Sequence, residues 1–283
     1  MDVWDTVEHT YPFARRVYTS DDDAVFDFAS LRAWPARDGA GRDVVIKVVA
    51  PMELDILKWL NSPKARADPR NISIPVLEYI KYNDYTFVVM PRWDIGWEHK
   101  FYTVADLMHA MGSYLQGVDF LHENRIAHCD LRVQNIGLNI IGTPTDSGRL
   151  ARDPAHALYT IFDFGGSFIY PRDTPLEKAL PLEKNTNGDV NPFQVDVALL
   201  GSVFQTWFKP AEELLPQITT LLKEMVHDKP QKRIIIHQTL ERFQEVHSNL
   251  RPDQLECAVS NQLKNNKGAL YTVFPGGAQP VPR

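Results

Sequence analysis

Cysteine is scarce in this sequence, which holds only Cys129 and Cys257 among its 283 residues. Two cysteines so far apart provide no disulfide framework, and this favours a reducing compartment. No apolar run approaches the roughly 18 residues that a membrane helix needs, and the opening residues lack the pattern of a secretory signal peptide. We therefore expect a cytoplasmic protein, without excluding the nucleus, and no membrane partner.

An excess of positive charge is also missing. Lys and Arg total 30 against 36 Asp and Glu, and the net charge is −6. Such a mildly acidic chain offers no basis for a nucleic-acid partner. The composition, 44% hydrophobic and 23% charged, is ordinary for a soluble globular protein with a real core. We expect a monomer.

The pattern of apolar residues changes about a third of the way along the chain. Strands are predicted at residues 30–38 and 42–50, and two more within 74–91 around the turn "NDY". Apolar residues at a spacing of three to four predict helices at 52–60, 103–126, 195–208, 213–227 and 234–248. The sequence thus predicts an α+β protein with a small antiparallel-sheet part (1–91), a larger helical part (92–250) and a C-terminal tail (251–283).

The stretch "IAHCDLRVQN" (126–135) places Asp130 and Asn135 five positions apart, directly after the long predicted helix. Together with the overlapping stretch "YLQGVDFLHENRIAHCDL", the segment resembles the helix and catalytic loop of the eukaryotic protein kinase superfamily. The chain is similar in style to divergent fungal members of that superfamily. The resemblance implies a bilobal kinase-like fold across the chain. It also implies that Asp130 orients the attacking hydroxyl, that Asn135 ligates Mg²⁺, and that Arg132 offers a cation to the transferred phosphate.

Two further motifs extend the resemblance. "FDFGG" (162–166) contains the metal-binding triplet of the family, so Asp163 would bind the Mg²⁺ that bridges the phosphates of ATP. "VVIK" ends in Lys47, where the family holds those phosphates, and "ELDILKWL" offers Glu53 as its partner. "FVVMPRW" stands at the hinge, so Met90 and Arg92 are expected to contact the nucleotide.

Spacing departs from the family pattern in two places. Only six residues separate Lys47 from Glu53, less than half of the usual interval. Either the helix has lost its first turns, or Glu53 lies on a different face. The interval from Asn135 to Asp163 is longer than in compact kinases, and its polar excess (142–157) reads as a surface loop inserted between two strands.

Other positions bear on regulation and on the nucleotide lid. Cys129 replaces the arginine that receives an activation-loop phosphate in regulated kinases, and we expect it to be a small buried side chain. The glycine-rich lid is missing, since residues 17–34 contain no glycine and include three consecutive aspartates, which we interpret as a solvated turn. By resemblance, Asp196 caps the catalytic loop and Arg233 pairs with Glu183. The histidines, His109 and His122 among them, have no ligand-like spacing and are assigned to packing or the surface.

These observations leave three classes of function open. The first is an ATP- and Mg²⁺-dependent phosphotransferase acting on Ser/Thr hydroxyls of a protein. The second is a pseudokinase that binds or scaffolds a partner without turnover. The third is a small-molecule kinase. The survival of Lys47, Glu53, Asp130, Asn135 and Asp163 in order favours the first, while nothing in the sequence names the substrate or partner.

Overall fold

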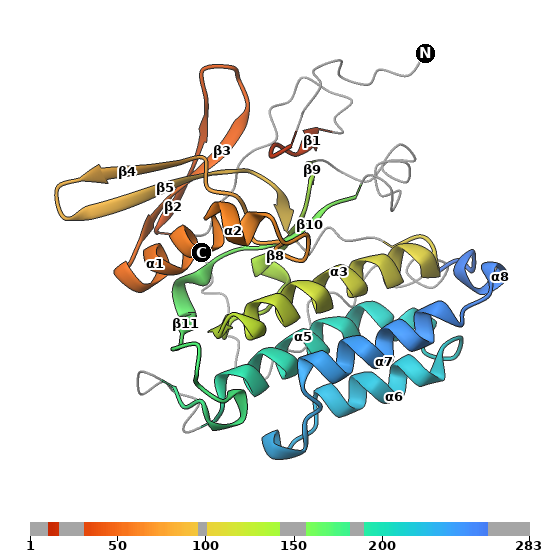
Figure 1. The fold of residues 1–283 in the computed structure, drawn as a ribbon. Helices are drawn as coiled ribbons and strands as arrows, with labels where there is room; N and C mark the ends of the chain where they lie inside the picture. The colour runs from red at the N-terminus through yellow and green to blue at the C-terminus, as the bar shows by residue number, and fades with distance from the viewer. Residues whose placement is uncertain (1–10, 17–30, 96–100, 142–156, 182–189, 260–283) are drawn as a thin grey trace, which may run out of the picture.

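The computed structural model describes residues 11–16, 31–95, 101–141, 157–181 and 190–259. Its strands are β1 (Arg15–Arg16), β2 (Ala33–Arg37), β3 (Asp43–Val49), β4 (Glu78–Tyr82), β5 (Tyr85–Pro91), β6 (Asp94–Ile95), β7 (Ile126–Ala127), β8 (Ile136–Leu138), β9 (Ile140–Ile141), β10 (Tyr159–Ile161) and β11 (Phe168–Ile169). Its α-helices are α1 (Pro51–Leu60), α2 (Pro63–Arg66), α3 (Val104–Glu123), α5 (Pro192–Phe208), α6 (Pro216–Met225), α7 (Ile236–Ser248) and α8 (Pro252–Leu255). The predicted α+β class is confirmed, with a sheet-rich N-terminal part above a helical C-terminal part, as expected for a bilobal kinase-like fold (Figure 1).

The N-terminal sheet has four antiparallel strands in the order β2-β3-β5-β4. Both predicted hairpins form, β2 with β3 and β4 with β5. The central strand β3 is rich in valine and isoleucine, residues that favour strands and pack well between neighbours. Helix α1 begins at Pro51, with only Ala50 between it and the end of β3 at Val49. Proline suits a first helical turn because it has no amide hydrogen that would need a partner.

A second, smaller sheet joins the two parts of the molecule. It has the order β10-β8-β6, with β6 and β10 both antiparallel to β8. The segment after α2 also pairs with β10, since Ile74 N donates to Ile161 O (2.9 Å) and Ile161 N donates to Ile72 O (3.0 Å). These hydrogen bonds fix the strand that leads into Asp163 against the N-terminal part. The inserted loop predicted between β9 and β10 lies, for residues 142–156, outside the described part of the chain.

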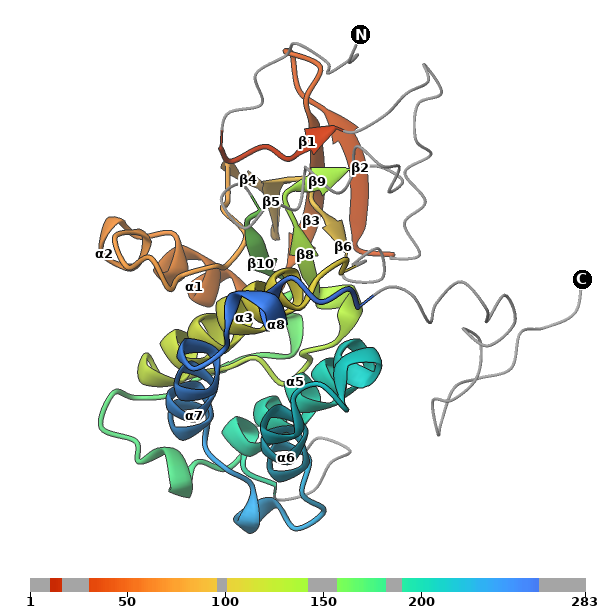
Figure 2. The ribbon, with the colours of Figure 1, turned by 90° about the vertical axis from the view of Figure 1, so that its right-hand side faces the viewer.

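The helical part is built around α3, which packs against α5 and α7 (Figure 2). Its N-terminus has a capping box, in which Thr103 Oγ1 accepts from Asp106 N (3.2 Å) and the Asp106 carboxylate accepts from Thr103 N (3.0 Å). Its inward face is almost wholly buried, including Leu107, Met111 and Leu115. Helix α3 therefore delivers the following loop from a rigid support.

The beginning of the tail contacts the start of α3. Val104 N donates to Cys257 O (3.0 Å) and Val259 N donates to Tyr102 O (2.9 Å), while α8 forms one helical turn just before. Residues 260–283 of the predicted tail lie outside the described residues. Within the described ranges, no helix combines the length and the apolar character needed to cross a membrane.

Candidate active site

The short interval between Lys47 and Glu53 brings the two side chains together. Lys47 lies near the end of β3, and Glu53 is the third residue of α1, which starts immediately afterwards. The Lys47 ammonium donates to Glu53 Oε1. Of the two explanations that the spacing left open, the helix therefore begins late and Glu53 lies on the face that meets Lys47.

The Lys47 ammonium also reaches Asp163, donating to Oδ1 at 2.7 Å. Asp163 is in the left-handed region (φ 63°) at the start of a short 3₁₀ turn, where its Oδ1 also accepts from Gly165 N (3.3 Å). The side chain of Asp163 is 46% exposed, against 5% for Glu53. One ammonium thus serves a buried carboxylate and a half-exposed one.

The two carboxylates have opposite pKa shifts. Burial raises the pKa of Glu53, and the opposing charge and hydrogen bond of Lys47 do not cancel the effect. Burial also acts to raise the pKa of Asp163, but there the charge and hydrogen bond of Lys47, together with the hydrogen bond from the Gly165 amide and the influence of His128, outweigh it, so that the pKa is lowered. A lowered pKa keeps the Asp163 carboxyl ionised at neutral pH, as a metal ligand must be.

A second cluster lies in the loop after β7. Asn135 Nδ2 donates to Asp130 Oδ2 (2.7 Å) and to the Asp130 carbonyl (2.9 Å), while Arg132 Nε donates to Asp130 Oδ1. The Asn135 amide oxygen accepts from no described residue. The predicted residues Asp130, Asn135 and Arg132 are thus in direct contact, and the amide oxygen of Asn135 is free to act as a ligand.

Two consecutive glycines, Gly165 and Gly166, lie between the Lys47 cluster and the Asp130 cluster. A Cβ on Gly165 would lie 3.5 Å from Glu53 Oε2 and 3.8 Å from Lys47 Nζ, while a Cβ on Gly166 would lie 4.0 Å from Asp130 Cβ. Larger side chains here would enter the space between the two clusters. Sequence reasoning used only the first of these glycines, as part of a triplet, and gave no role to the second.

Asp196 holds the backbone of the loop that carries Asp130, as predicted. Its Oδ2 accepts from His128 N (2.8 Å), its Oδ1 accepts from Cys129 N (2.6 Å), and its side chain is fully buried. His122 also binds this carboxylate, with Nε2 2.9 Å from Oδ2. The assignment of His122 to packing agrees with its burial. Its hydrogen bond to Asp196 could not be predicted from the sequence, because 74 positions separate the two residues.

His128 ties the loop to the strand that delivers Asp163. Its Nε2 is 3.0 Å from the Phe162 carbonyl, and its Nδ1 accepts from Asp130 N (3.3 Å). Burial lowers the pKa of His128, and a neutral ring with one donor and one acceptor fits both contacts. Cys129, predicted to be a small buried side chain, is only partly buried. Burial and then the charges of Asp196 and Asp130 raise its pKa, as befits an unreactive thiol.

Of the two hinge candidates, Met90 lies in the sheet and Arg92 directly after it. Met90 is buried in β5 opposite Val45, and Arg92 follows the strand. Arg92 N donates to the Asp43 carbonyl (3.1 Å), and its guanidinium lies 3.6 Å from Asp43 Oδ2. Contact of either side chain with a nucleotide stays a prediction.

Two sequence predictions fall outside the described residues. The glycine-free segment lies mostly within 17–30, and Glu183, the expected partner of Arg233, lies within 182–189. Arg233 itself donates to the carbonyls of His227 (2.9 Å) and Gln194 (3.0 Å), which ties the turn before α7 to α5.

No family model matches this chain. Among curated proteins, a segment of 79 residues is 32% identical to "Serine/threonine-protein kinase US3 homolog" of Cercopithecine herpesvirus 9 (strain DHV). The match covers 25% of this chain and 23% of the viral protein, so the chain spans under a quarter of that relative's length. This partial similarity, together with the α+β architecture, supports a kinase-like relationship.

Proposed function

We propose that this protein is an ATP- and Mg²⁺-dependent phosphotransferase that acts on Ser/Thr hydroxyls of a protein substrate. The observation that carries the proposal is the Lys47 ammonium, held between Glu53 and Asp163, with the Asp130–Asn135 cluster a glycine pair away. This arrangement brings together a phosphate-binding cation, two candidate metal ligands and a carboxylate for the nucleophile. The similarity to a viral protein named as a Ser/Thr kinase supports the choice of substrate class.

Each side chain has a distinct task in this proposal. Lys47, oriented by Glu53, would bind the phosphates by charge. Asp130 would accept a hydrogen bond from the substrate hydroxyl and orient it for attack, a contribution typically worth about 10²–10⁴-fold in rate. Arg132 (61% exposed) would first have to release Asp130 Oδ1 and could then turn to the phosphate.

The residues present fit a magnesium ion. Mg²⁺ prefers oxygen ligands from carboxylates and amides. Asp163 Oδ2 and the Asn135 amide oxygen accept from no described donor, and the Asp163 carboxyl is held ionised. When bound, the ion would neutralise negative charge on the phosphates. Asp163 and Asn135 would hold the ion and so position the phosphates relative to Lys47.

Two substitutions separate the proposed roles. Asp163→Asn should abolish Mg²⁺-dependent stabilisation by ATP, whereas Asp130→Asn should preserve it and remove phosphate transfer. At a hundredfold excess of ATP over its Kd, binding stabilises the folded state by about 2.7 kcal/mol, which a thermal-shift titration detects readily. Transfer is measured with radiolabelled ATP on a peptide library. Equal loss of ATP binding in both variants would show that the two roles are wrongly assigned.

A pseudokinase is the second candidate, favoured by one observation. Both carboxylate oxygens of Asp130 are already engaged, Oδ1 by Arg132 and Oδ2 by Asn135. A scaffold of this kind would bind ATP, or hold the same conformation without it, and transfer no phosphate. Arg132→Ala decides between the two, since it frees Oδ1 of an exposed competitor. Transfer by either form supports the enzyme: a rise in the variant would show that Arg132 blocks Oδ1, and a fall would show that its cation is needed at the phosphate. No transfer in either form supports the pseudokinase.

A further inference from the structure

A cavity of about 560 Å³ lies in the helical part, away from the candidate active site. The end of α3, the start of α5, the start of α7 and the segment around Leu176 form its walls. Most of the walls are apolar, formed by Pro175, Leu176, Phe193, Val197, Ile234, Ile235 and Ile236. A volume of about 300–1,000 Å³ with apolar walls and a few convergent polar groups is typical of sites for small organic molecules.

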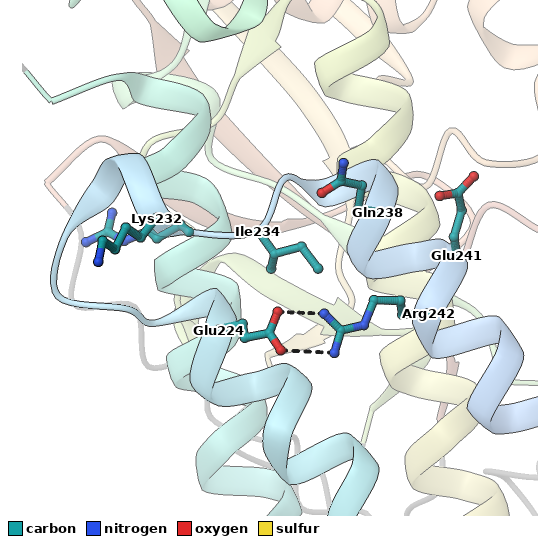
Figure 3. A pocket seen from close by; sticks show the side chains of 7 residues that line it. Glu224, Lys232, Ile234, Gln238, Glu241 and Arg242 are labelled. Carbon is teal, nitrogen blue, oxygen red and sulfur yellow. Dashed lines mark hydrogen bonds and ion pairs between the residues drawn. The ribbon is translucent and has the colours of Figure 1, made fainter.

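A neighbouring pocket of about 390 Å³ shows the contrast (Figure 3). It lies between α6, the turn before α7, and α7, and its lining is charged rather than apolar. Glu224 and Arg242 pair through two hydrogen bonds there, of 2.5 and 3.0 Å. The two charges neutralise each other and link α6 to α7, so the charged lining of this pocket is explained by its role in joining the helices. The apolar lining of the larger cavity has no such role.

Polar groups gather at one end of the larger cavity. Asp119, Glu123 and His237 bring one ligand atom each within 4.8 Å of one another, and Asp119 is 3% exposed. Arg70 bridges the two carboxylates, 3.3 Å from Asp119 Oδ2 and 2.7 Å from Glu123 Oε2. This guanidinium lies where a metal ion would have to bind the pair, which argues against a metal as the occupant.

The lining has more negative than positive charge, because it contains the three carboxylates of Asp119, Glu123 and Glu177 but the guanidinium of Arg125 alone. Glu177, which also lines the cavity, is exposed and has no ion-pair partner among the described residues. The guanidinium of Arg125 donates to three backbone carbonyls, of Thr174 (2.7 Å), Glu123 (3.1 Å) and His122 (3.3 Å), and to no carboxylate. An apolar ligand that carries a basic amine would match both the walls and this surplus.

The cavity touches the support of the catalytic loop. His122 and Phe193 both line it, and their rings pack edge-on with their centroids 4.8 Å apart. His122 Nε2 is 2.9 Å from Asp196 Oδ2, and the same carboxylate accepts from the amides of His128 and Cys129. A ligand that packs against His122 is therefore two hydrogen bonds away from the loop that carries Asp130.

We infer that this cavity is a binding site for a small apolar molecule bearing a basic amine, and that His122 and Asp196 transmit its occupancy to the catalytic loop. The binding is independent of phosphate transfer. Only its consequence for the rate rests on the proposed function. Binding in the cavity can affect the catalytic loop only if the ligand changes an interaction that the cavity and the loop share. We assign that role to the His122–Asp196 hydrogen bond.

Nuclear magnetic resonance on the full chain tests the site without nucleotide. The protein is titrated with 2-phenylethylamine, 2-phenylethanol and 3-phenylpropionate, which share a ring and differ in charge. We expect the amine to bind at least tenfold more tightly than the carboxylate, and Glu177→Gln to weaken the amine but not the alcohol. The amides of His128 and Cys129 should shift as the amine binds. Equal affinity for the amine and the carboxylate would refute the charge assignment.

Matched surface variants locate the binding. Ile235 lines the cavity and is 49% exposed, and Leu214 is 45% exposed and outside it. Ile235→Trp should fill the mouth and lower the amine affinity at least tenfold, whereas Leu214→Trp should leave it unchanged. Unchanged binding in Ile235→Trp would overturn the site. Binding that persists without any shift of the His128 and Cys129 amides would overturn the transmission. Neither readout depends on ATP, so failure of the proposed function would not imitate either result.

Discussion

Replacing Lys47 by methionine would test the charge arrangement of the candidate active site most directly. Methionine keeps most of the aliphatic stem, so the variant removes the ammonium while largely preserving the packing of β3. Two carboxylates then lose their shared partner, Glu53 at 5% side-chain exposure and Asp163 at 46%. The difference in burial decides the size of the effect.

The cost should come almost entirely from Glu53. Removing one partner of a buried ion pair typically costs about 3–5 kcal/mol, because the other charge remains buried without compensation. An ion pair of a half-exposed group is worth about 0–1 kcal/mol. We therefore expect Lys47→Met to lower the free energy of unfolding by about 3 kcal/mol at pH 7. In a Glu53→Gln background, where no buried charge is left behind, the same substitution should cost under about 1 kcal/mol.

The effect should also depend on pH, with a definite sign. Burial already raises the pKa of Glu53 above its unfolded value, and loss of the Lys47 ammonium raises it further. A raised pKa in the folded state contributes stability that is present below the unfolded pKa and is lost as the pH rises through the folded one. The deficit of Lys47→Met relative to wild type should therefore shrink between pH 7 and pH 5.

Urea unfolding followed by tryptophan fluorescence, at several pH values, measures these differences. The four proteins of the cycle are wild type, Lys47→Met, Glu53→Gln and the double variant. Asp163→Asn is the matched control for the exposed partner and should cost no more than about 1 kcal/mol. A cost for Lys47→Met that is the same in both backgrounds and at every pH would show that Glu53 does not depend on this ammonium.

Three further predictions concern other parts of the structure. A Cβ on Gly201 would lie 2.7 Å from Met225 Cβ, so Gly201→Ala should force α5 and α6 apart and cost about 1–3 kcal/mol in urea unfolding, whereas a stable variant would contradict the packing. The lowered pKa of buried His128 contributes stability that is present above its unfolded pKa and is lost on acidification below it, so His128→Asn should lose less stability than wild type between pH 7.5 and 5.5. The raised pKa of Cys129 should keep its thiol unreactive toward a thiol reagent at pH 8 until urea unfolds the chain, and fast labelling of the folded protein would contradict this.

Local patterns in the sequence were sufficient for the strands of the four-stranded sheet and for the longer helices, whereas the candidate residues were named through motifs that resemble a known family. The hairpins follow from valine-rich runs around short turns, and α3 follows from its apolar spacing. Asp130 and Asn135 lie five positions apart on one loop, so their contact is a short-range property of the chain. The hydrogen bonds that the loop amides donate to Asp196 were predicted through the family resemblance, because no local pattern connects residues 68 positions apart.

Contacts set by the packing of distant segments could not be predicted. The spacing of Lys47 and Glu53 allowed two arrangements, and only the start of α1 at Pro51 decides between them. The approach of Gly166 to Asp130 depends on how β10 is held by the segment after α2, and the large cavity depends on how α3, α5 and α7 meet. Such features arise from tertiary geometry, on which hydrophobic periodicity carries no information.

The presence of a cysteine, Cys129, in the loop that carries Asp130 is explained by how that loop is held. Its backbone is in the left-handed region (φ 63°), and its amide donates to Asp196 Oδ1 at 2.6 Å, so the loop depends on the main chain at this position and not on the side chain. The thiol instead packs against the small apolar cluster around Phe168 and Phe193. An arginine here would need an anionic partner to offset the cost of placing its charge beside those rings, whereas a cysteine needs none. The geometry around Asp130 therefore does not depend on a cation at position 129, and a rate controlled through phosphorylation of Thr174 would require a different cation, such as Arg172, to receive the phosphate.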